Sequence, residues 1–122
     1  MTTGIILFAH GARDPNWARP VERLQRMLIE RMPDALTETA YLEHMTPTLE
    51  DAADAMVASG ATALSVVPVF VAQGGHLRED LPRRVAAVAA KYPQVPVRIA
   101  PPIGEVDTIL AAITSWIEGM HK

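Results

Sequence analysis

Residues 63–76 read ALSVVPVFVAQGGH, an apolar run that is too short for a helix and ends in a glycine-rich turn. Such a run predicts a strand buried on both faces, as in a parallel sheet. Pro68 cannot donate to the sheet ladder, so we expect a break or bulge within the run. The same pattern occurs near the start of the chain, where residues 4–9 (GIILFA) precede His10 and Gly11.

Apolar residues at helical spacing separate these runs from further strand-like segments. They predict helices over residues 15–32, from Pro47 to Gly60, from near Asp80 to Lys91 and over residues 106–118, with further strands over residues 37–43 and 95–100. The strict alternation predicts one α/β domain over residues 1–122. We expect three layers, with a four-stranded parallel sheet and helices on both faces.

The composition restricts the function. A hydrophobic fraction of 49% with 20% charged residues is typical of a globular protein. There is no apolar run of about 18 residues and no basic leader, so we expect a cytoplasmic protein without a membrane partner. The formal charge of -3 argues against nucleic-acid binding. Because the chain has no cysteine, any metal must be held by His, Asp or Glu.

Three metal-competent side chains follow the predicted strands: His10, Glu43 and His76. In open α/β sheets ligands bind beyond the carboxyl ends of the strands, so these side chains should share one edge. Imidazole and carboxylate groups together suit divalent Co, Ni, Fe and Zn. Gly74 and Gly75 would let a bulky ligand approach the backbone. Taken singly, each histidine is more typical of a structural residue, Glu43 of a surface carboxylate, and the glycines of a tight turn.

Other chemistries are disfavoured by the turns themselves. Neither turn has the GxGxxG or GxxxxGK[ST] spacing of phosphate-binding loops, and there is no GxSxG elbow of a serine hydrolase. We expect His44 to point away from Glu43, because neighbouring residues of a strand face opposite sides. His121 lies near the end of the chain and stays outside the predicted site.

Two segments carry a resemblance to a known family. Residues 7–13 (LFAHGAR) and 66–82 (VVPVFVAQGGHLREDLP) resemble the small CbiX-type sirohydrochlorin chelatases, the short form of the class II chelatases. The likeness covers essentially the whole chain, including Leu42-Glu43 and the late segment Pro102-Ile103-Gly104. Ala12 is a departure, because the family often has a serine there, and its hydroxyl is missing from this turn.

The resemblance implies a lyase-class enzyme that inserts a divalent metal, with Co²⁺ favoured, into sirohydrochlorin without ATP, in cobalamin or sirohaem biosynthesis. The metal would be a substrate, with no permanent cofactor, and the chain would form a homodimer. By position, His10, His76 and Glu43 match the family's metal-binding and catalytic residues.

Sirohydrochlorin is a polycarboxylate, so an acidic protein needs local positive charge to hold it. We expect Arg13 and Arg78, beside the two site turns, to contact its carboxylates, together with Gly74 and Gly75. Arg83 and Arg84 are further candidates for contacts to the substrate carboxylates. The alternative for both is an exposed helix position with no contact to substrate.

Other functions remain open at this stage. The same reaction with iron or nickel is the nearest, because this ligand set does not select one first-row metal. A non-catalytic carrier of metal or tetrapyrrole is another. A metal-dependent hydrolase is disfavoured, since there is no dense cluster of Asp and His.

Overall fold

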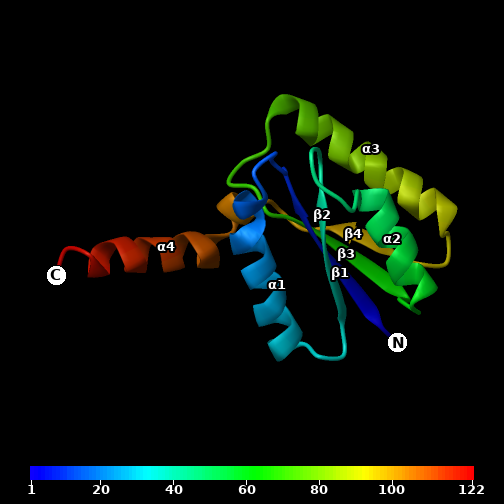
Figure 1. Ribbon diagram of the computed structural model, residues 1–122, viewed down its shortest axis with the longest axis horizontal. Helices are drawn as coiled ribbons and strands as arrows, with labels where there is room; N and C mark the ends of the chain where they lie inside the picture. Colours follow the sequence, from blue (N-terminus) through cyan, green and yellow to red (C-terminus); the bar gives the residue numbers. More distant parts are fainter.

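The computed structural model describes residues 1–122 and shows three layers, with a parallel sheet between helices (Figure 1). The order in the sheet is β2-β1-β3-β4, and every pair is parallel. The strands are β1 (Thr3–Ala9), β2 (Leu36–Tyr41), β3 (Ala63–Pro68) and β4 (Val97–Ile99). This confirms the predicted fold class.

The helices divide unequally between the two faces. The side chains of α2 and α3 share a core cluster with one face of β1, and those of α1 share a second cluster with the other face. No helix is long and apolar enough to cross a membrane. The helical elements are η1 (Pro15–Ala18), α1 (Arg19–Arg31), α2 (Leu49–Ala58), α3 (Gly75–Lys91), η2 (Ile103–Glu105) and α4 (Asp107–Gly119), where η denotes a 3-10 helix.

The apolar run in β1 reflects its position in the middle of the sheet. Ile6 and Phe8 point toward α2 and α3, whereas Ile5 and Leu7 point toward α1. All four side chains are buried. A strand covered on both faces needs apolar residues at every position, which is why the run does not alternate with polar residues.

Helix α3 differs from the expectation that it starts near Asp80. It begins at Gly75, so Pro82 lies inside the helix rather than at its first turn. Leu77, Leu81 and Val85 continue the helical spacing on both sides of the proline and are buried. Their packing against the sheet keeps the helix continuous although a proline inside a helix removes one hydrogen bond.

The predicted strand over residues 95–100 is reduced to β4 (Val97–Ile99), and the two strands that precede candidate site residues also end earlier than expected. β3 ends at Pro68, the residue that cannot donate to the ladder. β2 ends at Tyr41 rather than Glu43. Beyond it the chain bends, and His44 has a φ of 66°, which is outside the strand region. The residues that follow both strands are therefore in loops at the carboxyl edge of the sheet.

A polar cluster ties α2 to the end of α3. Asp54 accepts hydrogen bonds from the Tyr92 hydroxyl and from Lys91 Nζ, the latter at 2.9 Å. These two hydrogen bonds, that of Tyr92 first, hold the pKa of Asp54 below its usual 3.8. A carboxyl with a lowered pKa stabilises the fold above the unfolded-state pKa, and the contribution is lost as the pH falls through the folded-state value.

Replacing Tyr92 by Phe should raise the pKa of Asp54 toward 3.8, because the larger of the two hydrogen bonds is removed. The acid side of the stability curve should then move to higher pH. NMR titration of the Asp54 carboxyl measures the pKa, and Tyr41→Phe, which also removes a phenol, is the matched control. An unchanged Asp54 pKa in Tyr92→Phe would contradict this account.

Candidate metal and ligand site

The first element of the site is a histidine–glutamate pair at the carboxyl edge of the sheet. His10 is the residue directly after β1, and Glu43 follows β2. His10 Nε2 lies 3.1 Å from Glu43 Oε1, within hydrogen-bond distance. The side chains are 53% and 50% exposed, so both groups remain accessible to a ligand. If Nε2–H donates to the carboxylate, the Nδ1 lone pair is free to take a metal ion or a proton.

Gly11 allows the two loops to lie this close. The backbone continues the strand pairing past the end of β1, since the Glu43 amide donates to the His10 carbonyl at 3.1 Å. Gly11 has a φ of 92°, a region that favours glycine. A Cβ at this position would overlap the carbonyl oxygen of Glu43. Because glycine has no Cβ, the Glu43 backbone can lie directly against the turn that follows His10.

His44 lies on the same side as Glu43, and the expectation that it points away is wrong. Its Nε2 is 3.7 Å from Glu43 Oε1. The alternation of a strand does not apply here, because β2 has already ended and His44 has a positive φ. A positive φ is not visible in the sequence at a histidine, so no local pattern would have placed this side chain beside the pair.

His76 lines the same cavity as the His10–Glu43 pair. It lies in the first turn of α3, after the loop that follows β3. No group of three or more His, Asp or Glu side chains is close enough to hold a metal ion, so His76 lines the cavity without joining the pair in a cluster of that kind. The cavity has a volume of about 650 Å³ and is lined by His10, Leu42, Glu43, Phe70, Ala72, Gly74, His76, Leu77, Glu79, Asp80, Arg83 and Arg84.

An aromatic side chain forms part of the wall beside His10. Phe70 packs edge-on against the His10 ring, with 6.3 Å between centroids, and in the same way against the buried Phe8. Phe70 thus fixes one side of the imidazole to the core. Phe70 was not among the predicted site residues, although its place in the apolar run after β3 is consistent with such a contact.

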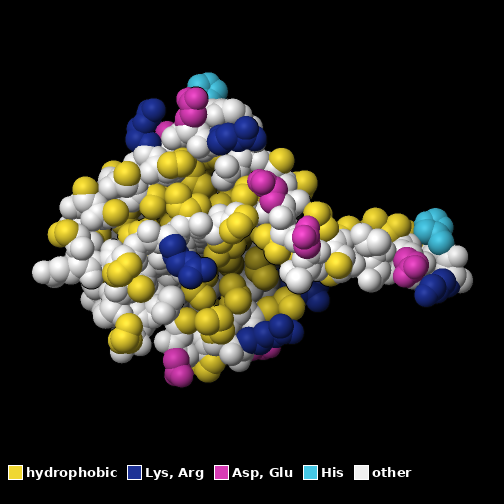
Figure 2. Space-filling view, turned by 180° about the vertical axis from the view of Figure 1, so that it is seen from behind, with side chains coloured by type: hydrophobic (Ala, Val, Ile, Leu, Met, Phe, Trp, Pro, Cys, Tyr) yellow, Lys and Arg dark blue, Asp and Glu magenta, His cyan; other side chains and the backbone are white.

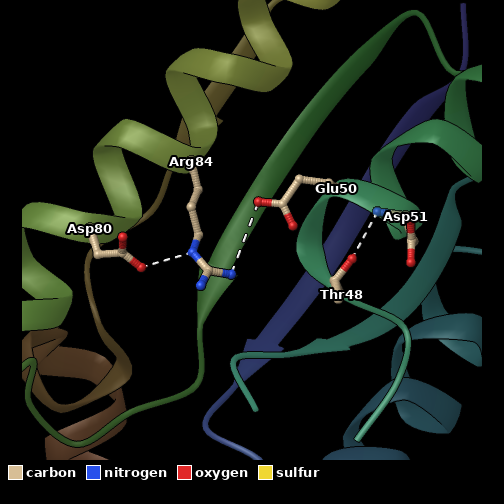
Figure 3. Close-up of polar contacts among 5 residues, drawn as sticks. All are labelled: Thr48, Glu50, Asp51, Asp80 and Arg84. Atoms are coloured by element: carbon tan, nitrogen blue, oxygen red, sulfur yellow. Dashed lines mark hydrogen bonds and ion pairs between the residues drawn. The ribbon is translucent and has the colours of Figure 1, made fainter.

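Two arginines on α3 carry positive charge to the cavity. Arg84 Nε donates to Asp80 Oδ2 at 2.8 Å, and its Nη1 lies 4.0 Å from Glu50 Oε1 on α2 (Figure 3). Thr48, which caps α2 through the Asp51 amide, holds the start of that helix beside this contact. Arg83 makes no ion pair and is exposed. Its guanidinium is free to bind an anion.

Only one of the remaining predicted site residues lines the cavity. Gly74 lines it, whereas Gly75, Arg13 and Arg78 do not. Gly75 is the first residue of α3, and Arg13 and Arg78 are exposed. The structure therefore brings His10, Glu43, Gly74 and His76 to one cavity. Arg13 and Arg78 are not among the residues that line it.

Comparison with known proteins gives a consistent result. A family model described as CbiX matches residues 4–119. The sirohydrochlorin ferrochelatase of Bacillus subtilis (strain 168) is 27% identical over 113 residues, which are 93% of this chain and 43% of that protein. The sirohydrochlorin cobaltochelatase of Methanosarcina acetivorans is 30% identical over 79 residues, which are 65% of this chain and 61% of that protein. The chain thus spans about half the length of these relatives.

A solved structure agrees in fold along the whole chain. The crystal structure of a "putative cobalamin (vitamin B12) biosynthesis CbiX protein" from Marinobacter aquaeolei VT8 superposes with a TM-score of 0.83 at 32% identity. The match covers 97% of this chain and 96% of that one. The two chains therefore share one fold over almost their whole length.

Replacing Gly11 by Ala should destabilise the fold and separate Glu43 from His10. Gly60→Ala is the matched control, because Gly60 also has a positive φ, of 100°, but a Cβ there would meet no atom. The positive φ alone costs about 1–2 kcal/mol in each variant. Gly11→Ala should therefore lose more free energy of unfolding than Gly60→Ala, as measured in urea, and should shift the NMR signals of the His10 ring. Equal losses, with His10 signals unchanged, would show that the close approach has no such role.

Proposed function

Because this chain belongs to the CbiX family, we propose that it catalyses the ATP-independent insertion of a divalent metal ion into sirohydrochlorin. The observation that carries the proposal is the His10–Glu43 pair, which shares a cavity with His76 at the carboxyl edge of the parallel sheet. Both relatives described above are named as sirohydrochlorin chelatases. The metal is a substrate of this reaction, and the proposal requires no permanent cofactor.

We assign the incoming metal to the two histidines. Metal insertion needs a partly dehydrated cation next to the macrocycle and the removal of two pyrrole protons. A neutral imidazole can do either job. One of the two histidines accepts the pyrrole protons as the macrocycle nitrogens take over the metal, and Glu43 relays these protons onward. Glu43 hydrogen-bonds His10 and supplies negative charge beside the cation. An incomplete protein shell is useful here, because the macrocycle nitrogens must take over the open positions.

Cobalt is the metal that we favour, and iron and nickel are the alternatives. Imidazole and carboxylate ligands bind all three, in the order of increasing affinity Fe²⁺, Co²⁺, Ni²⁺. The names of the relatives include both cobalt and iron. We further propose a homodimer in the cytoplasm. The Bacillus relative, of which this chain spans 43%, has room for two such units in one chain.

Alanine at His10 or His76 should slow metal insertion by at least about tenfold, since the loss of even an outer-shell partner of a metal ligand typically costs about 10–100-fold. The measurement is the absorbance change of sirohydrochlorin mixed with Co²⁺, Fe²⁺ or Ni²⁺, which also ranks the metals. His121→Ala, near the end of the chain and outside the cavity, is the matched control. Wild-type rates and metal affinity in His76→Ala would refute its assigned role, and tight binding without turnover in the wild type would indicate a carrier.

The proposal also identifies contacts for the substrate carboxylates. Arg83 lines the cavity and has no acidic neighbour within ion-pair distance, so its charge is free for a carboxylate. Arg84 is held between Asp80 and Glu50, which fixes its position but neutralises part of its charge. Arg13 and Arg78 remain proposed contacts for carboxylates that extend past the cavity.

Replacing Arg83 by Ala should raise the KM for sirohydrochlorin by at least about tenfold, since a charge-assisted hydrogen bond contributes about 1.5–3 kcal/mol. We expect kcat to change less, because Arg83 is assigned to binding. Arg78→Ala should raise the KM by a smaller factor. Arg31→Ala, at the end of α1, is the control for a lost surface charge. An unchanged KM in Arg83→Ala would exclude the contact.

A further inference from the structure

Acidic and basic side chains are mixed on the first turns of α3. At the top of Figure 2 they gather, together with a histidine, over this part of the helix. A substrate that carries several carboxylates therefore meets negative as well as positive charge on this wall of the cavity. Arg84 is the residue where the two signs meet, because carboxylates from two helices approach its guanidinium.

Asp80 is the firm partner of Arg84. The two residues are four positions apart on α3, and Arg84 Nε donates to Asp80 Oδ2 at 2.8 Å. A short hydrogen bond between two charged groups is stronger than one between neutral groups. Asp80 therefore fixes the side of the guanidinium that carries Nε.

Glu50 is the loose partner of the same guanidinium. Its Oε1 lies 4.0 Å from Arg84 Nη1, which is an ion-pair distance but is too long for a hydrogen bond. The Glu50 side chain is 43% exposed. An exposed ion pair of this kind contributes little to stability, because water screens the two charges. Glu50 can therefore leave Arg84 with little cost to the fold.

The two carboxylates approach different nitrogens of the guanidinium (Figure 3). An arginine binds a carboxylate bidentately through two neighbouring N–H groups, and its fork of donors offers more than one such edge. Asp80 already accepts from Nε. The edge left for a ligand is thus the one formed by the two terminal nitrogens, and Nη1 on this edge is the atom that Glu50 faces.

Arg84 can be reached from the cavity and from α2. Arg84 and Asp80 line the cavity, whereas Glu50 does not. Leu49 is buried in the core and Thr48 caps the helix, so the backbone of Glu50 is fixed at the start of α2. The Glu50 carboxylate therefore stays within reach of Arg84 after a ligand has displaced it, and acts as a competitor at high effective concentration.

We propose that Glu50 sets the affinity of Arg84 for a carboxylate of the substrate. Glu50 faces the terminal edge of the guanidinium in the free protein, and a substrate carboxylate that binds at this edge displaces it. This inference rests on the proposed chelatase function, which supplies the polycarboxylate. Glu50 takes no part in metal insertion itself, and it influences specificity only through its competition for Arg84.

The same competition assists the release of product. The metallated macrocycle carries the same carboxylates as the substrate, so it binds Arg84 in the same way. When the product leaves, Glu50 returns to Nη1, and the terminal edge of the partly buried guanidinium regains a negatively charged neighbour. The departure of the product therefore costs less than it would without Glu50.

Replacing Glu50 by Gln removes the charge and keeps the shape of the side chain. The variant should bind sirohydrochlorin about two- to fivefold more tightly, the range expected when an exposed ion pair no longer competes with the ligand. The measurement is a titration of metal-free sirohydrochlorin with protein, followed by absorbance, which reads binding without metal insertion. A purely structural role of Glu50 would leave the affinity unchanged or weaken it, so a gain separates the two roles.

Asp51→Asn is the matched control. Asp51 also lies in the first turn of α2, makes no ion pair, and does not face Arg84 (Figure 3). Glu50→Gln and Asp51→Asn each remove one negative charge from the chain and from the same helix end. Asp51→Asn should therefore change the affinity much less, since it leaves the contact to Arg84 intact.

A double variant tests whether Glu50 acts through Arg84. In an Arg84→Gln background the guanidinium is gone, so Glu50→Gln should no longer tighten binding. The inference is overturned if Glu50→Gln gives no gain in affinity, if Asp51→Asn gives the same gain, or if the gain persists in Arg84→Gln. These three results leave the proposed function intact, whereas a wild-type chain that binds no sirohydrochlorin overturns both.

Discussion

The parallel pairing of β1 on both of its sides is the constraint on which the rest of the structure depends. β1 lies between β2 and β3, and its side chains are buried against helices on both faces. Parallel neighbours cannot be joined by a tight turn, so each connection crosses the sheet and carries a helix. All four strands then end at one edge. His10 directly follows β1, which lies between β2 and β3. The segments that leave these two strands therefore flank His10.

The fold and part of the site could be predicted from local patterns, and the exceptions share a physical cause. The spacing of apolar residues separates strands from helices. This was enough to predict the three layers and to place His10, Glu43 and His76 at one edge of the sheet. It failed at His44 and at the start of α3. In both places a non-local contact decides: the close approach of Gly11 to Glu43 reshapes the loop after β2, and burial of Leu77 and Leu81 extends a helix across Pro82.

The cavity combines opposite charges in a way that composition alone conceals. The chain has a net charge of -3, yet the wall formed by α3 presents Arg83 and Arg84 beside Glu79 and Asp80. Arg84 is restrained by carboxylates from two helices, which reduces its freedom to reorient. A cation and a polyanion could therefore be held in neighbouring parts of one cavity, with the carboxylate of Glu43 on the side of the histidines.

The projecting position of α4 (Figure 1), none of whose residues is buried, divides the molecule into regions of unequal local stability. Amide hydrogens in β1 are enclosed by the core and can exchange with solvent only when the whole domain opens, whereas those of α4 are released by the unwinding of one short helix. The final turns of the chain can thus melt and re-form many times while the sheet stays intact. The same sequence that builds a rigid edge around His10 therefore ends in a segment whose order depends on what it touches.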